Sequence, residues 1–509
     1  MSHLAKLPPA RVLHAAPLGA ALILALAPPA AAQLGAGVPR ATRLEVTTSS
    51  PEARTAFTTG LEDAVTGFPN RATVRLKKAI DADPSFGLAR VIHAITAPGL
   101  TQAQRAAEIE RGVADATKAS TGELLVATAY RESFRQNPTG ARAILLSAAT
   151  LLPDEPQVAY QRAVLLGNVT GGMPTDAVVA LKAVVERFPD YAPAYNSLAY
   201  AQWISGARAD AIATATTFMA KAPSHPKSHD TYAELLQWDG NFEAAVAHYR
   251  KAIELDATFL GGSYGLSEVF VLQGKYDLAR QALAAAVPAT TMPAQRATIQ
   301  SRIANTFVLE GNVKSAMAAV GAMIEEAQKA ELTPQVAGGH LALMYLEAAF
   351  GDPKTSARAV AAHIGHIAAL PPPPAGATPP NPATRFFNNG VAYALAGQPA
   401  SARVYLDSLS TYAPTVTSPT AARTAANQVH GLTGWVLYSE GKYAEALAEF
   451  RQDNSQIPMV RTGIALTQFK LGNVVEARSI RDEVMNDRNL NLANGANVTA
   501  RRILKVKIT

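Results

Sequence analysis

The chain has 509 residues, 48% of them hydrophobic and 17% charged, and contains no cysteine. The lack of cysteine excludes disulfides, thiolate metal sites and lipid attachment through an N-terminal cysteine, so stability must come from packing. The formal net charge is +6. Much of this excess lies near the two ends: Lys6 and Arg11 on one side, and five basic residues against Asp487 alone on the other. The region between them is close to neutral, so we expect no binding to nucleic acid.

The first residues have the order of a secretory signal peptide. Lys6 and Arg11 precede a short apolar run, Leu18–Leu26, and small residues follow up to Ala32. The alternative is a membrane anchor, but the apolar run is well short of the roughly 20 residues that span a bilayer. We therefore predict a signal peptide over 1–32, cleaved after Ala32, and a mature chain without a transmembrane segment in the periplasm or outside the cell.

After an extended segment over 33–50, a fixed period runs along the chain. Glycines recur every 34 residues in its clearest stretch, and an alanine follows each of them five residues later: Gly172 and Ala177, Gly206 and Ala211, Gly240 and Ala245, Gly274 and Ala279. A period of this length is typical of stacked helix–turn–helix units.

One unit shows how the residues produce this structure. The pattern predicts a helix over Pro193–Ser205, a turn at Gly206–Arg208 and a second helix over Ala209–Lys221, closed by Pro223. Glycine ends the first helix because it takes left-handed backbone geometry without a side-chain penalty. The alanine lies where the two helices come closest, and proline stops the second helix. The next units are predicted as His229–Trp238 with Phe242–Glu254, and Tyr264–Gln273 with Tyr276–Ala286.

These units resemble the tetratricopeptide repeat family, in its secreted bacterial form. The first helices carry the large-then-small pairs of that family, at Leu198-Ala199, Tyr232-Ala233 and Leu266-Ser267. The resemblance implies an all-α fold, a right-handed α-solenoid of stacked antiparallel helix hairpins. We count about eleven units between residues 51 and 485, with degenerate copies near 88–120 and 340–370. Later glycine turns are predicted at Gly311, Gly351, Gly397, Gly441 and Gly472.

A proline-rich stretch interrupts the array. Residues 371–383 cannot be helical and are predicted to be an extended linker between a block over 51–370 and a shorter block over 384–485. We favour a joint with restricted motion, and the alternative is a long loop within one solenoid. Residues 486–509 have lost the repeat pattern and are predicted to be a basic tail. Within it, residues 503–509 alternate apolar and basic side chains as a strand does.

Motifs that could support catalysis lack their structural setting. Residues 261–265 match G-x-S-x-G, but a predicted helix precedes them where a nucleophile elbow needs a strand. Residues 224–227 match S-x-x-K within a link between units. The histidine pairs His225/His229 and His363/His366 show no third or fourth ligand for zinc. No glycine-rich loop has the spacing of a nucleotide site. We therefore expect no enzyme activity, no cofactor and no catalytic or metal-binding residues.

The remaining candidate is a binding surface. The family resemblance implies that the first helix of each unit lines a concave wall, which here would consist of Asn196, Tyr200, Trp203, Lys227, Asp230, Glu234, Trp238, Tyr264 and Glu268. Phe387, Trp435 and Tyr438 would extend the wall in later units. Aromatic anchors among polar groups are typical of peptide-binding surfaces. The alternative is that the aromatic rings fill gaps between successive first helices.

The sequence thus indicates a protein–protein interaction scaffold or adaptor of the bacterial cell envelope, without enzyme activity. It would bind a segment of a protein or peptide partner along the concave wall. The alternative is a substrate-binding subunit of an envelope enzyme complex. A catalytic domain in the same chain would need a non-repeat block of about 100 residues, and no such block is present.

Overall fold

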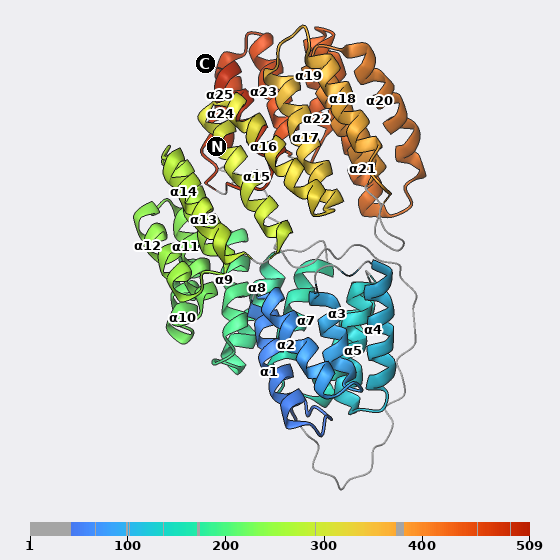
Figure 1. The fold of residues 1–509 in the computed structure, drawn as a ribbon, viewed down its shortest axis with the longest axis vertical. Helices are drawn as coiled ribbons and strands as arrows, with labels where there is room; N and C mark the ends of the chain where they lie inside the picture. The colour runs from blue at the N-terminus through green and yellow to red at the C-terminus, as the bar shows by residue number, and fades with distance from the viewer. Residues whose placement is uncertain are drawn as a thin grey trace, which may run out of the picture. The chain divides into compact units, whose positions relative to one another are not determined.

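The computed structural model describes residues 42–66, 68–97, 100, 102–135, 137–169, 174–290, 292–372, 381–455, 457–488 and 490–508. The predicted signal peptide over 1–32 lies outside the described residues, as does most of the predicted linker over 371–383. Within the described ranges, every regular element is a helix (Figure 1). None of these helices is both long enough and apolar enough to cross a membrane.

The all-α fold class is therefore confirmed. The helices are α1(Pro51–Thr66), α2(Pro69–Ala82), α3(Gly87–Thr96), α4(Gln102–Ala116), α5(Thr121–Phe134), α6(Pro138–Leu151), α7(Pro156–Val169), α8(Pro174–Arg187), α9(Ala192–Ile204), α10(Arg208–Lys221), α11(Pro226–Asp239), α12(Phe242–Leu255), α13(Leu260–Leu272), α14(Tyr276–Ala286), α15(Pro293–Glu310), α16(Val313–Lys329), α17(Thr333–Phe350), α18(Ser356–Ala368), α19(Pro382–Leu395), α20(Pro399–Tyr412), α21(Pro419–Ser439), α22(Tyr443–Gln452), α23(Pro458–Lys470), α24(Val474–Met485) and α25(Gly495–Lys507). Taken two at a time, α1 to α24 form twelve successive pairs, where about eleven were expected. Two short 3-10 turns, Val287–Ala289 and Ala413–Thr415, follow α14 and α20.

Glycine turns separate the helices of many pairs, as predicted. Seven of them have a positive φ: Gly206, Gly240, Gly274, Gly311, Gly397, Gly441 and Gly472. At the first of these, the N–H of Ala207 donates to the carbonyl of Gln202 at 2.9 Å, which closes the helix end in a Schellman arrangement. Gly351 differs, because its φ is −68° and its backbone is extended. The predicted turn at Gly351 therefore lacks the left-handed conformation.

Small residues allow the helices of a pair to approach closely. Ala211, Ala245 and Ala279 have no solvent-exposed surface, as expected for the position five residues after each turn glycine. Successive pairs also approach closely, because a Cβ added to Gly265 in α13 would lie 2.1 Å from the ring of Tyr249 in α12. Packing of this tightness leaves no room for larger side chains.

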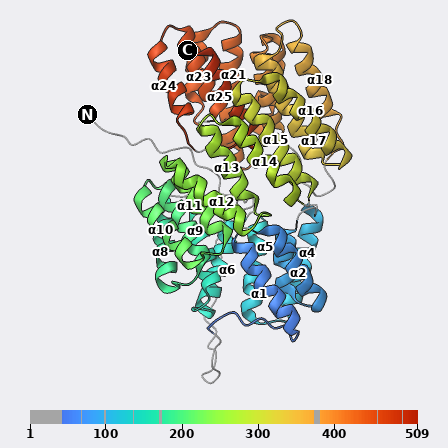
Figure 2. The ribbon, with the colours of Figure 1, turned by 60° about the vertical axis from the view of Figure 1, so that its left-hand side comes forward.

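Cα packing divides the described chain into two compact units, with the division between Leu235 and Leu236 in α11. In the first unit each pair packs on the next from α1 to α10, and Figure 2 shows the helices α1 to α10 in blue to green. The extended residues before α1 are held by this unit, because the N–H of Leu44 donates to Glu155 Oε2 at 3.1 Å. Burial raises the pKa of Glu123, whose Oε1 accepts hydrogen bonds from the N–H and hydroxyl of Thr47.

The second unit extends from the end of α11 to α25 and contains one continuous core on both sides of the proline-rich stretch. Met344 and Tyr345 of α17 share that core with Phe387 of α19 and Trp435 of α21. Helices on both sides of the predicted boundary at 371–383 thus share one core. This packing favours the alternative, a long loop within one array.

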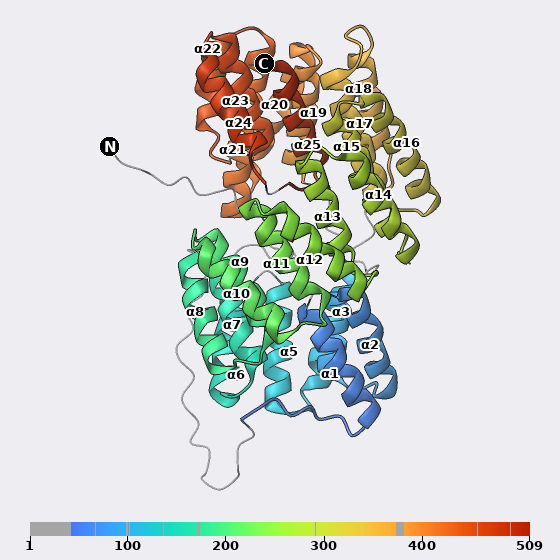
Figure 3. The same ribbon diagram turned by 90° about the vertical axis from the view of Figure 1, so that its left-hand side faces the viewer.

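The strand predicted over 503–509 is wrong. Residues 503–507 belong to α25, whose apolar side chains Val498, Ala500, Ile503 and Leu504 are buried. The helix packs against α15, α17, α23 and α24 of the same unit, and Figure 3 shows it beside α15. A lone strand would have left its backbone groups without partners, whereas a helix satisfies them internally. The stretch predicted as a basic tail is therefore folded over residues 490–508.

Candidate functional site

The residues predicted for the concave wall lie on the first helices of three successive pairs. Asn196, Tyr200 and Trp203 are on α9, Lys227, Asp230, Glu234 and Trp238 on α11, and Tyr264 and Glu268 on α13. The first six, from Asn196 to Glu234, belong to the first unit and the last three to the second. Their role in binding a partner remains a prediction.

In the first unit, these residues form a linked polar cluster between α9 and α11. The hydroxyl of Tyr200 donates to Glu234 Oε2 at 2.6 Å, and these residues are 34 positions apart, one repeat period. Lys227 Nζ pairs with Asp230 Oδ2 at 2.8 Å and lies 3.5 Å from the hydroxyl oxygen of Tyr200. Equivalent positions of neighbouring repeats are therefore in contact.

The cluster carries two carboxylates and one ammonium group with restricted access to water. Burial alone would lower the pKa of Lys227, but Asp230, Tyr200 and Glu234 outweigh it and raise this pKa. Burial, with the nearby Glu234 carboxylate, raises the pKa of Tyr200. At neutral pH the lysine is thus charged and the phenol keeps its proton, so the cluster can offer both donors and acceptors.

The second unit has a related arrangement one period further on. Glu268 Oε1 accepts from Arg302 Nη1 at 3.0 Å, and these two residues are again 34 positions apart. The guanidinium of Arg302 also lies 3.9 Å from the centre of the Tyr264 ring. The same carboxylate oxygen accepts the backbone N–H of Leu492 at 3.2 Å. A residue predicted to bind a partner segment therefore binds a stretch of its own chain.

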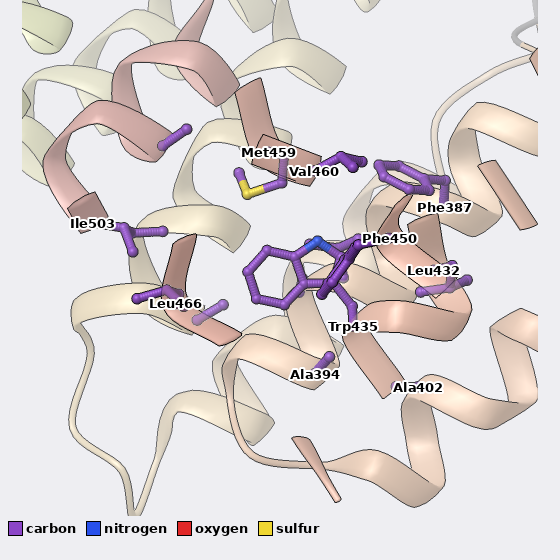
Figure 4. Close-up of a cluster of buried hydrophobic side chains, with 14 of the residues drawn as sticks. Phe387, Ala394, Ala402, Leu432, Trp435, Phe450, Met459, Val460, Leu466 and Ile503 are labelled. Carbon is purple, nitrogen blue, oxygen red and sulfur yellow. The ribbon is translucent and has the colours of Figure 1, made fainter. Parts of the chain in front are cut away.

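Three aromatic rings of the predicted wall are buried. Trp435 is fully buried and packs edge-on against Phe450, with ring centroids 5.6 Å apart (Figure 4). Phe387 is also buried in this cluster. Their assignment to the wall is wrong, because both rings fill space between helices. Trp203 is 7% exposed, with the guanidinium of Arg208 at 5.2 Å from its ring.

A family model described as tetratricopeptide repeat matches residues 234–291. This range includes the hairpin of α13 and α14 and the whole of α12. The chain contains tetratricopeptide repeats. The tetratricopeptide units support a protein–protein interaction scaffold in general terms, since stacked repeats of this kind form extended binding surfaces. A search of curated proteins found no match.

Three solved structures are similar to this chain at low sequence identity. MamA from Desulfovibrio magneticus is 18% identical, with 33% of this chain and 94% of that chain covered and a TM-score of 0.29. TTC0263, a tetratricopeptide protein from Thermus thermophilus, is 20% identical over 36% of this chain and 98% of that chain, with a TM-score of 0.29. A tetratricopeptide repeat protein from Parabacteroides merdae is 13% identical over 62% of this chain and 98% of that chain, with a TM-score of 0.35.

The tetratricopeptide fold also explains the G-x-S-x-G match. Ser263 is buried within the first turns of α13, and a Cβ on Gly262 would lie 3.0 Å from the carbonyl oxygen of Tyr249. These glycines allow α13 to pack on α12, and no strand precedes the serine as a nucleophile elbow requires.

Two features of the tetratricopeptide array were missed in the sequence. His340 of α17 meets the predicted pair His363 and His366, with 3.2 Å between the Nδ1 atoms of His340 and His363. Within the described ranges, no group of three or more histidine, aspartate or glutamate side chains has the geometry of a metal site. Arg302 was missed as well, although counting one period on from Glu268 identifies it.

Proposed function

We propose that this protein is a scaffold of the bacterial cell envelope, without enzyme activity, that binds a segment of a partner protein along the first helices of its repeats. The observation that carries this proposal is the polar cluster of α9 and α11. Tyr200, Lys227 and Glu234 come from neighbouring repeats, hydrogen-bond across the period, and combine donors and acceptors with an apolar ring. Partner segments bind to surfaces that combine such groups with aromatic side chains.

The test compares two double variants with matched changes in charge. Lys227→Ala with Glu234→Ala removes one positive and one negative charge from the cluster. Glu243→Ala with Arg250→Ala does the same at exposed positions of α12. After cross-linking in cells and purification from the envelope fraction, we expect partners to be retained by the α12 variant and lost by the cluster variant. A folded cluster variant that retains every partner would contradict the proposal.

The envelope location is a separate part of the proposal. It is supported by the order of basic, apolar and small residues over 1–32. Mass spectrometry of the mature protein from a periplasmic or extracellular fraction should show an N-terminus at Gln33. Recovery of the uncleaved chain from the cytoplasm alone would exclude this location.

A further inference from the structure

The stretch between α24 and α25 lies against the first helices of the second unit. We call residues 486–494 the crossing segment, and its described residues, 486–488 and 490–494, have no helical structure. Its neighbours are α11, α13 and α15, each the first helix of its pair. These are the helices on which a tetratricopeptide array is expected to bind partners.

Side chains of these helices bind the backbone of the crossing segment. Gln237 Nε2 on α11 donates to the carbonyl oxygen of Arg488 at 3.1 Å. Glu268 Oε1 on α13 accepts from the N–H of Leu492, and Asn305 Nδ2 on α15 donates to the carbonyl of Leu492 at 2.8 Å. Amide and carboxylate groups that bind main-chain atoms in this way hold a peptide backbone whatever its side chains are.

The binding groups are themselves held in place. Gln237 Oε1 accepts from the hydroxyl of Tyr249 at 3.0 Å, which fixes the amide so that its nitrogen faces the crossing segment. Glu268 is fixed by Arg302 in the same manner. A site whose polar groups are oriented by neighbours loses less entropy on binding a peptide than a site of free side chains.

Three side chains of the crossing segment provide sequence preference. Leu490 and Leu492 are 2% and 0% exposed. Arg488 Nη1 donates to the carbonyl oxygen of Asp239 at 2.6 Å, at the C-terminal end of α11, where the helix dipole favours a cation. The arginine lies against the turn at Gly240, where an added Cβ would be 2.3 Å from Nη1. The pattern bound is thus Arg-x-Leu-x-Leu.

A cavity remains next to the crossing segment. It has a volume of about 500 Å³ and is lined by α15, α17 and residues 491–496, including Thr298, Ser301, Tyr345 and Asn494. Fully packed cores leave few voids larger than a water molecule. The crossing segment is therefore bound by its backbone and two leucines rather than by close packing on all sides.

We propose that the first-helix face of the second unit is a binding site for a non-helical peptide with the pattern Arg-x-Leu-x-Leu, which the chain's own crossing segment occupies. An external segment of this pattern binds by displacing it. Because α24 and α25 hold both ends of the crossing segment, its effective concentration is high and only a favoured partner competes. This proposal adds a class of ligand to the proposed scaffold function. It rests on that function only for the identity of the natural partner.

The experiment uses the mature chain and a fluorescein-labelled synthetic peptide with the sequence of residues 486–494. In a released variant, Arg488→Ala, Leu490→Asp and Leu492→Asp weaken the crossing segment and leave α25 unchanged. We expect anisotropy to show peptide binding by the released variant and none by the wild-type chain. Adding Asn305→Ala to the released variant should weaken its affinity for the peptide about tenfold, because roughly one hydrogen bond is lost. A peptide with both leucines replaced by aspartate should not bind.

The control variant Val506→Asp changes an exposed side chain of α25 and should bind no more peptide than wild type. A released variant that is helical by circular dichroism but binds no peptide would overturn the proposal. Equal binding by the wild-type chain would also overturn it, because the site would then be open. The cluster variant of α9 and α11 tests the scaffold function in a separate experiment. Failure of the scaffold proposal can therefore be distinguished from failure of the peptide-site proposal.

Hydrogen exchange of the wild-type chain gives a second test that does not depend on a variant folding. Peptic fragments covering the crossing segment should exchange faster than fragments of α13 and α15, because displacement requires only local opening. Exchange of the crossing segment at the same slow rate as α13 and α15 would show that it opens only with the core, which would contradict the proposal.

Discussion

At the scale of single residues, four side chains at equivalent positions of successive repeats show the 34-residue period. Tyr200, Glu234, Glu268 and Arg302 are spaced by 34 positions, and hydrogen bonds join Tyr200 to Glu234 and Glu268 to Arg302. The sequence predicted the first three, because α9, α11 and α13 have 13 or 14 residues and share the turn spacing. Arg302 was missed because α15 is longer, with 18 residues. The glycine turn that follows it therefore no longer keeps the period.

The alanine five residues after each turn glycine occupies a position where we expect no large side chain to fit. Ala245 is fully buried on α12. Ala245→Trp should lower the free energy of unfolding by about 1–3 kcal/mol or more, because overpacking forces side chains and backbone to shift. Ala247→Trp, on the exposed side of the same helix, should change it by less than about 0.5 kcal/mol. Chemical denaturation measures both, and equal stability of the two variants would show that the assumed contact is wrong.

The three histidines predict a dependence of stability on pH. Burial, with the neighbouring His340 and His366, lowers the pKa of His363 to about 4. Burial also lowers the pKa of His340. Because both pKa values lie below that of an unfolded histidine, the folded state favours neutral rings. The stabilisation is complete above about pH 6.5 and is lost as the pH falls toward 4.

Thermal unfolding between pH 8 and pH 5 checks this expectation. The melting temperature should fall in the wild-type chain and fall less in His363→Gln, which cannot gain a proton at that position. His248→Gln, on α12, serves as a control for removal of a histidine elsewhere. An identical pH dependence in wild type and His363→Gln would show that carboxylates alone account for it.

At the scale of helices, the sequence predicted the best-preserved elements closely. The helix predicted over Tyr276–Ala286 has those bounds, and the one predicted over Pro193–Ser205 runs over Ala192–Ile204. The prediction failed at the C-terminus, where residues 503–509 alternate in period two. Ala500, Ile503 and Leu504 also have the spacing of one helical face, and a short apolar run does not decide between the two periods. Contacts with α15 and α17, distant in sequence, decide it.

Turn glycines and helical glycines should respond in opposite ways to the same substitution. Gly274 has a φ of +73° and Gly321 lies within α16, and no atom lies within 4 Å of an added Cβ at either position. Gly274→Ala should cost about 1–2 kcal/mol, because alanine is strained in left-handed geometry. Gly321→Ala should stabilise by about 0.5–1 kcal/mol. Denaturation curves that move in the same direction would exclude this explanation of the turn.

At the scale of the whole molecule, stability is distributed along the chain. Within each compact unit, pairs of helices pack on their neighbours, so the unfolding free energy is a sum of local terms and interfaces. The second unit adds contacts of another kind, because α25 joins α15 and α17 to α23, which is far from them in sequence. The repeat period predicts contacts between neighbouring repeats. It does not predict that a C-terminal helix packs against repeats that are far from it in the sequence. This is why the stacked fold could be predicted from the sequence, whereas the site around the crossing segment could not.

Removal of these long-range contacts should destabilise one unit selectively. A chain ending at Met485 lacks the buried side chains of Leu490, Leu492, Ile503 and Leu504. Each such side chain contributes about 1.5–3 kcal/mol when buried. Hydrogen exchange should therefore show lost protection in α15, α17 and α23, with protection of α1 to α10 unchanged, because those helices belong to the other compact unit. The variant Lys505→Ala with Lys507→Ala removes two exposed charges but no packing and should exchange as wild type does. Unchanged protection of α15 and α23 in the shortened chain would mean that neighbouring repeats alone hold the second unit together.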